Sequence, residues 1–373
     1  MGFLDLKYEA FGLDINDLSL KIVKLKKQRK GFVLDSFNQT KIMPGVIQDG
    51  VIRKEAVLVR AIKSAYDTVK GKKIKSKYVI ASLPEENSFL QVIKMPKMTE
   101  EELKLAVPLE AENYIPLSIN EVYLDFQVIS STKDYLNYLE VLIVAMPKKI
   151  VDSYVSCFKK AGLVPIILEA ESEAITRALI KNDANPSLVV LIDFGQNSTN
   201  LIVYSGHSIR FTSSIPISSD SLTRAISESL KIDLHEAEKI KIEHGLIGNK
   251  STVRLSSNNF RLEKATKAMC LVLEDLTEQI KKYLKFYRDH SSYEHVLPNR
   301  KTEKILLCGG GSELKGLTDF MSKHLEIPVE LGDPLVNVYS KKVKSLIKES
   351  LSPFTTAIGL AIRQVDNNKD YKT

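Results

Sequence analysis

Cysteine is scarce in this sequence, and long apolar runs are absent from it. The three cysteines among 373 residues, Cys157, Cys270 and Cys308, lie far apart and form no CxxC pair. This spacing supplies neither a disulfide framework nor a cysteine zinc site, and it fits a reducing cytoplasm. The longest apolar stretch, residues 141–147, is far shorter than the ~20 residues of a membrane-spanning helix, and no signal peptide opens the chain. We therefore expect a protein that stays in the compartment where it is made.

Histidine motifs are also missing. No HExxH spacing, which would indicate a zinc enzyme, occurs among the six histidines, His207, His235, His244, His290, His295 and His324. Isolated histidines are mostly structural or exposed, so we expect no histidine-based active site.

Positive charge is present in excess, with 53 basic and 46 acidic residues and a formal net charge of +7. Lysines cluster in "KLKKQRK" (24–30) and "KGKKIKSK" (70–77). Solvated charge on a hairpin and a linker is the first interpretation, and attraction to an anionic membrane surface is the second. No aromatic residues interleave with these lysines to form a stacking platform, which disfavours nucleic acid as a partner.

The length of the chain indicates more than one domain, because a single core stops growing at roughly 250 to 300 residues. A repeat suggests how the chain is divided. Residues 10–37 and 189–217 share one plan: an apolar run, an aspartate, a short polar turn, an alternating strand, a turn and another strand. Asp14 matches Asp193, so a β-hairpin with an acid near the end of its first strand is predicted twice. Two related α/β halves that face each other across a cleft would explain this duplication.

The segment between the two hairpins differs in character. Residues 77–96 are rich in strand-forming residues, and 99–116 form an amphipathic pattern with Thr99 and Glu102 in the positions of a capping box. Pro108 removes one hydrogen bond from that helix and predicts a kink or a division. We interpret residues 78–165 as a small α+β module inserted into the first half.

The second half is predicted to contain helices at 219–230 and 234–243 and a long helix whose apolar stripe is Ala265, Met269, Val272, Leu276, Ile280, Tyr283 and Tyr287. A buried strand and a triple glycine follow within residues 304–317.

The turn after the second acidic strand carries donors suited to phosphate. Gly195 permits a close approach of the backbone, and the next positions add side-chain donors to their amide groups: Asn197, Ser198, Thr199 and Asn200. Asp193 is unsuited to bare phosphate, and its natural role is to hold Mg²⁺ through water. Asp14 would do the same from the first hairpin, so that two carboxylates flank one metal-bound polyphosphate.

The triple glycine, Gly309, Gly310 and Gly311, leaves a flat backbone surface against which a planar base can lie. A turn needed only for helix packing explains the same motif equally well.

These motifs together resemble the actin-like ATPase superfamily. Asp14 with Lys21 is followed, in the superfamily's order of phosphate, adenosine and connecting elements, by "IDFGQNSTN", "AEKIKIEHG", "LLCGGGSELKGL" and "SPFTTAIGLAI". Residues 93–129 and 144–172 are similar to the PilM family of type IV pilus assembly, and the module resembles one that the family shares in position with FtsA. The resemblance covers about residues 9 to 364.

The resemblance implies an α/β protein with the actin-like ATPase fold, in which duplicated ribonuclease H-like domains surround a nucleotide cleft. The first half would comprise 1–77, completed by 166–186 and 340–373, and the second half 187–339. The bound group would be ATP with Mg²⁺.

Site residues are implied one by one. Asp14, Ser19 and Lys21 match the first phosphate loop, and the second is matched by Gly195, Asn197, Ser198 and Thr199. Glu238 and Lys241 match the pair expected at the ribose and base, and a solvated ion pair is the competing interpretation. Gly309, Gly310 and Gly311 match the adenosine loop. Glu171 lies where the superfamily's connecting helix supplies a residue that orients water, although an acid at a helix N-terminus is also stabilised by the helix dipole.

One position departs from the family pattern. The first phosphate loop normally reads Asp-x-Gly, whereas position 16 is Asn. Asn adds a side chain where glycine admits phosphate closely, so we expect binding to survive and at most slow ATP hydrolysis.

The expected function is a nucleotide-binding scaffold, cytoplasmic and peripheral at the inner membrane, in the type IV pilus assembly platform. The implied partner is the cytoplasmic N-terminal tail of a PilN-like membrane protein, with Leu103, Val107 and Tyr114 near its groove, and other platform proteins or a second copy are further candidates. Contact with the membrane would be indirect.

Three alternatives stay open. They are an FtsA-like division protein, which the polar end "QVDNNKDYKT" disfavours; a secretion-platform protein with a degenerate nucleotide site; and a small-molecule kinase, for which no inserted substrate domain is found.

Overall fold

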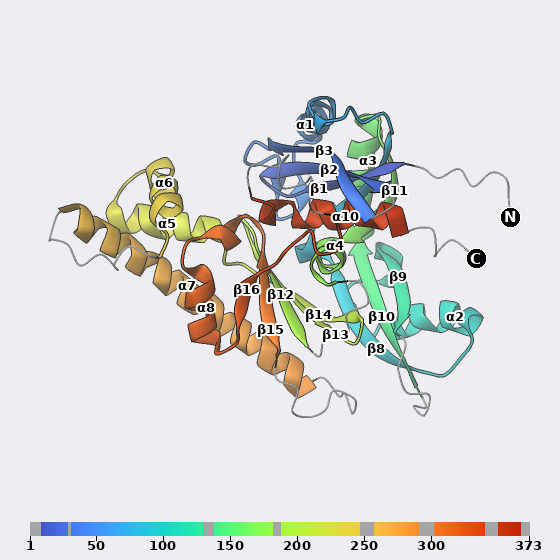
Figure 1. The fold of residues 1–373 in the computed structure, drawn as a ribbon. Helices are drawn as coiled ribbons and strands as arrows, with labels where there is room; N and C mark the ends of the chain where they lie inside the picture. The colour runs from blue at the N-terminus through green and yellow to red at the C-terminus, as the bar shows by residue number, and fades with distance from the viewer. Residues whose placement is uncertain are drawn as a thin grey trace. The chain divides into compact units, whose positions relative to one another are not determined.

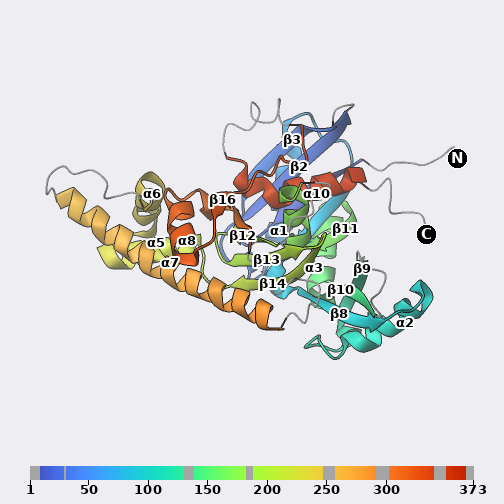
Figure 2. The same cartoon turned by 60° about the horizontal axis from the view of Figure 1, so that its bottom comes forward.

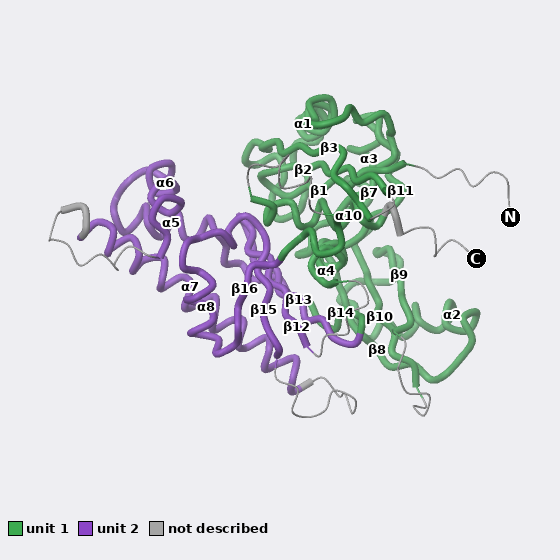
Figure 3. The backbone as a smooth tube through the Cα atoms, in the orientation of Figure 1, with its two compact units in different colours: residues 1–184, 207–212, 333–373 green, residues 185–206, 213–332 purple. Residues whose placement is uncertain are grey.

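The chain divides into two compact units. The computed structural model describes residues 9–28, 31–129, 138–181, 188–246, 257–290, 302–339 and 350–366. Unit 1 comprises residues 1–184, 207–212 and 333–373, and unit 2 comprises 185–206 and 213–332 (Figure 3). The arginine and lysine at 29–30, and parts of the ranges predicted to complete the first half, lie outside the described residues.

Unit 1 is built on a six-stranded sheet with the order β11-β7-β1-β2-β3-β6 (Figure 1). Its strands are β1 Ala10–Ile15, β2 Ser19–Gln28, β3 Gly31–Lys41, β6 Lys70–Gly71, β7 Tyr78–Leu83 and β11 Val164–Ala170. β1 is antiparallel to β2 and parallel to β7, which is in turn parallel to β11. Every residue of β1 is buried, as expected for a central strand covered on both faces.

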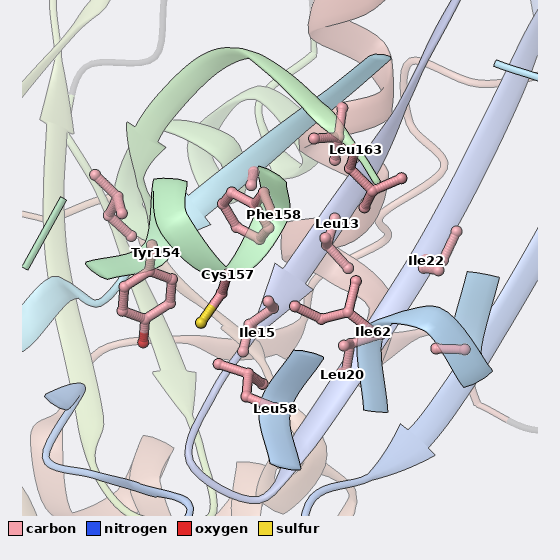
Figure 4. Close-up of a cluster of buried hydrophobic side chains, with 14 of the residues drawn as sticks. Leu13, Ile15, Leu20, Ile22, Leu58, Ile62, Tyr154, Cys157, Phe158 and Leu163 are labelled. Carbon is pink, nitrogen blue, oxygen red and sulfur yellow. The ribbon is translucent and has the colours of Figure 1, made fainter. Parts of the chain in front are cut away.

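Helices cover both faces of this sheet. One core joins β1 and β2 to α1 (Glu55–Asp67) and α3 (Lys148–Lys160); Figure 4 shows Leu13, Ile15, Leu20, Ile22, Leu58, Ile62, Tyr154 and Phe158 packed within it. A second core packs β2 and β3 against α10 (Thr355–Asp366). Gly12 lets α10 approach β1, because a Cβ there would lie 2.8 Å from the backbone nitrogen of Ala361. The smaller elements of unit 1 are β4 Ile47–Gln48, β5 Val51–Ile52, α4 Glu171–Leu179 and the 3₁₀ turns η1 Glu85–Asn87, η2 Ile119–Glu121 and η5 Ser352–Phe354.

The inserted module has a core of its own. Its strands β8 Phe89–Pro96, β9 Val122–Ile129 and β10 Tyr138–Pro147 pair antiparallel, with β10 in the middle, and α2 (Glu100–Ala111) packs on them. The capping box of Thr99 and Glu102 is present, and α2 runs through Pro108 without division. β7 and α3 lie in the sheet and core of unit 1, whereas the separate core of the module is formed by residues of β8, α2, β9 and β10 and of the turns beside them. The predicted domain boundaries themselves stay a prediction.

Unit 2 contains the neighbouring strands β16-β15-β12-β13, of which Figure 2 labels β16, β12 and β13. They are β12 Val189–Phe194, β13 Thr199–Ser205, β15 Lys304–Cys308 and β16 Val329–Leu331; β14 (Ser208–Ile215) begins in unit 1 and ends in unit 2. The helices are α5 Ser219–Leu230, α6 Leu234–His244, α7 Ser257–His290 and α8 Leu317–Leu325, with a 3₁₀ turn η3 at Gly310–Glu313. The predicted stripe on α7 is buried at five of its seven positions, and Leu273 and Leu284 are buried in place of the half-buried Val272 and Tyr283.

The predicted repeat is confirmed by the strand register. Asp14 lies opposite Lys21 in the β1–β2 hairpin, and Asp193 lies opposite Asn200 in the β12–β13 hairpin. Each hairpin continues into parallel neighbours in the same order, β2-β1-β7-β11 and β13-β12-β15-β16. Each unit therefore places one aspartate near the carboxyl end of its central strand.

Candidate functional site

The aspartate of the first hairpin is buried and fully engaged. One carboxylate oxygen of Asp14 lies 2.9 Å from the Nζ atom of Lys21, and the other accepts a hydrogen bond of 3.1 Å from the hydroxyl of Ser82 on β7. The exposed fractions of Asp14 and Lys21 are 3% and 6%. A buried ion pair contributes little net stability, because removing two charges from water offsets their attraction. The pair therefore contributes little to folding stability, and its main effect is to hold the two charges in fixed positions.

Asn16 occupies the turn of the same hairpin. Its side-chain oxygen Oδ1 accepts hydrogen bonds from the backbone N–H of Leu18 (3.2 Å), the backbone N–H of Ser19 (2.8 Å) and the hydroxyl of Ser19 (3.1 Å). Asn16 is not among the residues with positive φ, so the turn does not need glycine for its backbone conformation. The donors that a phosphate would use are instead satisfied within the turn.

The turn of the second hairpin is hydrogen-bonded to the N-terminus of a helix that begins about twenty residues later in the chain. Gly195 donates its N–H to the carbonyl of Ser198 at 3.0 Å and accepts a hydrogen bond from the N–H of Ser219, the first residue of α5, at 3.0 Å. Asn197 is exposed and Ser198 is half-buried. Thr199 and Asn200 are buried, and the hydroxyl of Thr199 donates to the carbonyl of Ile217 at 2.5 Å. The hydroxyl of Thr199 thus ties the end of the turn to the segment that precedes α5.

The glycine turn after β15 lies against the end of β12. Because the two strands are parallel, Asp193 lies opposite Cys308, the residue before Gly309. Gly309 has φ of 83°, and a Cβ there would overlap the carboxylate of Asp193 and lie 2.7 Å from the carbonyl oxygen of Phe194. A Cβ at Gly311 would lie 2.7 Å from the ring of Phe194.

Gly309 and Gly311 are therefore glycines for close packing. At Gly310 an added Cβ meets nothing within 4 Å. Of the three, Gly310 alone presents its Cα to open space, and only there does a flat surface remain for a planar base.

The predicted pair on α6 belongs to a wider network. Lys241, 6% exposed, lies 2.7 Å from the carboxylate of Glu238, so both side chains are on one face of α6. Its Nζ atom also donates to the carbonyl of Ser219 at 3.0 Å, to the hydroxyl of Ser219 at 2.7 Å and to the hydroxyl of Thr223 at 2.9 Å. Since the N–H of Ser219 bonds Gly195, a hydrogen-bonded path joins α6 to the turn of the second hairpin.

The predicted residues of unit 2 thus form two contact groups. Asp193 lies on the glycine turn, and Gly195 is linked through Ser219 to Lys241. One half-buried carboxylate beside a partly exposed turn fits a Mg²⁺ ion, which keeps most of its waters and needs only one or two carboxylates. Asp14 fits less well, because both of its oxygens already accept from protein donors.

Glu171 begins α4 in unit 1 and is buried. It follows β11 directly, just as Asp14 lies near the end of β1, so both acids are at the carboxyl edge of the parallel strands. Glu85, which follows β7 at the same edge, accepts the backbone N–H of Ser172 at 2.9 Å, and burial raises its pKa. Sequence reasoning missed Glu85 because it is not part of the repeated hairpin, although an acid close to the end of a buried strand was also part of the signal that selected Asp14.

The side chains predicted near a partner groove divide between two environments. Leu103 and Val107 of α2 lie in the core of the module, with exposed fractions of 3% and 0%, whereas Tyr114 is 41% exposed. Their positions leave Leu103 and Val107 unable to contact a partner. β9 is the outer strand of the module, and it exposes Tyr123 and Val128.

Comparison with known proteins gives consistent matches. A model of the family described as type IV pilus assembly protein PilM matches residues 12–365. A solved structure of the PilM-PilN type IV pilus biogenesis complex superposes with a TM-score of 0.78 at 27% identity, covering 96% of this chain and 99% of that chain. MreB5 of Spiroplasma citri bound to ADP superposes with a TM-score of 0.55 over 97% and 98% of the two chains, and at 13% identity it shows the fold alone.

Among curated proteins, the cell division protein FtsA of Pseudomonas aeruginosa is 27% identical over 222 residues, which are 57% of this chain and 51% of the relative. The chain spans about half the length of the curated relatives it matches. The expected fold class, an α/β protein with the actin-like ATPase fold and a small inserted α+β module, is confirmed. In the described part of the chain, no helix is both long and apolar enough to cross a bilayer.

Proposed function

Because the chain belongs to the PilM family of type IV pilus assembly proteins, an actin-like ATPase family, we propose that it is a nucleotide-binding scaffold of the inner-membrane assembly platform of the type IV pilus. It binds Mg-ATP and the cytoplasmic tail of a PilN-like membrane protein, and it is cytoplasmic and peripheral at the inner membrane through that partner. The observation that carries the proposal is the hydrogen-bonded path from Lys241 through Ser219 to Gly195.

In unit 2, this hydrogen-bonded path links the turn that would contact the phosphates of a nucleotide to the helix that would contact its ribose and base. The partly exposed residues Asn197 and Ser198 carry side-chain and backbone groups suited to phosphate oxygens, next to the N-terminus of α5, and Gly195, whose N–H is bonded to the carbonyl of Ser198, holds the turn. Asp193 holds Mg²⁺ through water, and the ion neutralises phosphate charge. Glu238, whose side chain is 45% exposed, is placed on α6 to accept from ribose hydroxyls, and Gly310 leaves room for the base.

In unit 1, Lys21 supplies a fixed positive charge for phosphate and Glu171 is the candidate for orienting a water molecule. That Asp14 and Asp193 flank one ion stays a prediction. Phosphoryl transfer depends on positioning and electrostatic stabilisation. Because Asn16 uses the backbone donors of its own turn, stabilisation of a developing γ-phosphate charge from this loop is weak. We therefore assign ATP binding with at most slow turnover.

The outer edge of β9 supports a place for the partner tail. An extended peptide that adds to a sheet edge gains main-chain hydrogen bonds, and side-chain contacts alternate along it. Exposed Tyr123 and Val128 provide apolar contacts on this strand. The similar solved structure is a complex of PilM with PilN, which supports the identity of the partner.

A secretion-platform protein with a degenerate nucleotide site is the second candidate. The internally satisfied turn at Asn16 favours it. The network around Lys241 argues against complete degeneration.

The decisive experiment measures Mg-ATP affinity and turnover of the parent protein, Asp193→Ala and a control, Glu228→Ala, which removes an exposed acid on α5. We expect measurable binding with little turnover in the parent, a loss of magnesium-dependent affinity in Asp193→Ala and no change in the control. Absence of binding in the parent would move the assignment to the degenerate platform.

A second experiment tests the partner site with a synthetic tail peptide from the neighbouring PilN-like protein. Val128→Asp on β9 should weaken capture of the peptide at least about tenfold, because a charge replaces an apolar side chain that the bound peptide would cover. Leu105→Asp, on the exposed face of α2, is the matched control. Equal loss in both variants, or in neither, removes the β9 edge from the mechanism.

A further inference from the structure

Positive charge is concentrated in one part of unit 1. Residues 21–77 contain 16 basic and 4 acidic side chains, a net charge of +12, whereas the whole chain carries +7 and its remainder therefore −5. The excess is thus a local property of the segment from β2 to the start of β7. Apart from Lys21, which the proposed function assigns to phosphate, this charge belongs neither to the nucleotide site nor to the β9 edge.

Five exposed lysines lie on one short segment of unit 1. The segment begins at β6, the last strand in the sheet order, and crosses to the start of β7, which pairs with β1 and β11 at the other side of the sheet. We name this segment the lysine edge; its exposed lysines are Lys70, Lys72, Lys73, Lys75 and Lys77.

The backbone of the lysine edge is fixed to the rest of unit 1. Lys72 donates its N–H to the carbonyl of Asp35 at 3.0 Å, and its own carbonyl accepts from the hydroxyl of Ser36. The buried hydroxyl group of Tyr66 donates to the carbonyls of Ile74 (2.9 Å) and Ser76 (3.0 Å). The lysines are therefore presented by an anchored segment, so little backbone entropy is lost when they bind.

Most of this charge is not neutralised. Lys72 forms an ion pair with Asp35 at 3.1 Å, and within the described residues the other four lysines form no ion pair. Lys70 lies over the ring of Phe37 at 5.7 Å and Lys77 over the ring of Tyr66 at 4.2 Å. These contacts hold the aliphatic parts in place and leave the charged ends at the surface.

We propose that the lysine edge binds an anionic lipid bilayer surface directly. This goes beyond the proposed function, in which the membrane is reached only through a partner protein. Lysine is a hydrated point charge that gains from a diffuse negative potential without requiring fixed geometry, and each one near an anionic bilayer contributes about fivefold to partitioning. Recognition of individual phosphates would instead favour the forked geometry of arginine, which the lysine edge lacks.

Nucleic acid is the less favoured polyanion. Binding to single strands uses exposed aromatic rings on which bases stack. Phe37 and Tyr66, the rings beside the lysine edge, are both 8% exposed and lie beneath lysine side chains.

The test measures sedimentation of the full chain with vesicles that contain phosphatidylglycerol and with vesicles of phosphatidylcholine alone. No partner peptide or nucleotide is present, so the outcome is independent of the proposed function. The test variant is Lys73→Gln/Lys75→Gln/Lys77→Gln. The control, Lys264→Gln/Lys267→Gln/Lys282→Gln, removes the same charge from exposed positions on α7.

We expect the parent to bind the anionic vesicles only, with binding that weakens as salt is raised. The test variant should lose on the order of 100-fold in partitioning and the control less than about threefold. Circular dichroism and Mg-ATP binding of the test variant should match the parent, which shows that it is folded.

Three results would overturn the proposal: no binding of the parent to anionic vesicles at low salt, equal losses in the two triple variants, or binding of an oligonucleotide through these lysines in the absence of vesicle binding.

Discussion

Replacement of Asn16 by glycine restores the residue that the first phosphate loop of actin-like ATPases normally carries, and its effect on the turn follows from the structure. The variant loses three hydrogen bonds accepted by Oδ1, two from backbone N–H groups and one from a hydroxyl. All four turn residues, 16–19, are half-buried, so water replaces the lost acceptor. Each lost hydrogen bond should therefore lower the free energy of unfolding by about 1 kcal/mol, and the larger cost of leaving a buried group unpaired does not arise.

The free energy of unfolding of Asn16→Gly is expected to be about 2 to 3 kcal/mol lower than that of the parent. Three bonds that share one acceptor contribute about 2 kcal/mol, and the greater freedom of glycine in the unfolded chain adds about 0.5 to 1 kcal/mol. Local opening that is about 2 kcal/mol easier corresponds to about a 30-fold faster exchange of the freed amides. At the same time, two backbone N–H groups become available to phosphate oxygens, so turnover of ATP should rise.

Hydrogen exchange of the peptide that contains Leu18 and Ser19 reads the turn directly, and urea unfolding reads the cost to unit 1. Asn16→Asp is the matched control, since its carboxylate keeps the acceptor and should leave exchange within a factor of about 2. Its added negative charge should weaken nucleotide binding. Unchanged exchange and unchanged turnover in Asn16→Gly would refute the conclusion that Asn16 occupies the donors of this loop.

Three further predictions follow from buried or half-buried groups. Gly309→Ala should lower the free energy of unfolding in urea by at least about 2 kcal/mol, because φ of Gly309 is 83° and a Cβ there overlaps neighbouring atoms. Gly310→Ala is the control: an added Cβ meets nothing within 4 Å, so the urea midpoint should not change. Burial, with a smaller effect of the carboxylate of Glu169, raises the pKa of Glu173 from 4.5 to about 7. The protonated side chain therefore contributes stability that is fully present below pH 4.5 and is lost as the pH rises through about 7. Glu173→Gln should remove this pH dependence of the free energy of unfolding, and an unchanged pH dependence in the variant would contradict the prediction. Glu140 and Arg210, whose side chains are 9% and 10% exposed, form a buried ion pair at 2.6 Å. Glu140→Gln leaves the charge of Arg210 buried without its partner, so it should lower the free energy of thermal unfolding by about 3 to 5 kcal/mol. The double variant Glu140→Leu/Arg210→Met removes both charges and should lower it distinctly less.

Local patterns were sufficient to predict much of the fold. The hairpins containing Asp14 and Asp193, the capping box at Thr99 and the stripe on α7 all follow from alternation, helical spacing or cap chemistry within about ten residues. Such signals depend on neighbours in the sequence, so a single sequence contains them. The resemblance to a known family supplied the order in which these parts assemble.

Contacts between distant segments could not be predicted in the same way. The spacing of Glu238 and Lys241 indicated a shared helical face, but nothing in it indicated that Lys241 bonds Ser219 and Thr223 on another helix. The same limit applies to the triple glycine, for which the sequence left a base-binding surface and a packing turn equally open, and close packing at Phe194 explains two of the three glycines.

The two hairpins share a backbone plan but differ in what their turns can offer to a ligand. In the first, the side chain of Asn16 consumes the amide donors, and Lys21 remains as a charge. In the second, Gly195 has no side chain to compete, and its turn is bonded to the start of α5. Binding requires charge and donors from at least one turn, whereas fast hydrolysis requires donors arranged around the developing charge on the transferred phosphate. Under the proposed function, a chain whose first turn satisfies its own amide donors is suited to slow turnover of the nucleotide that it binds, which agrees with the role of a scaffold.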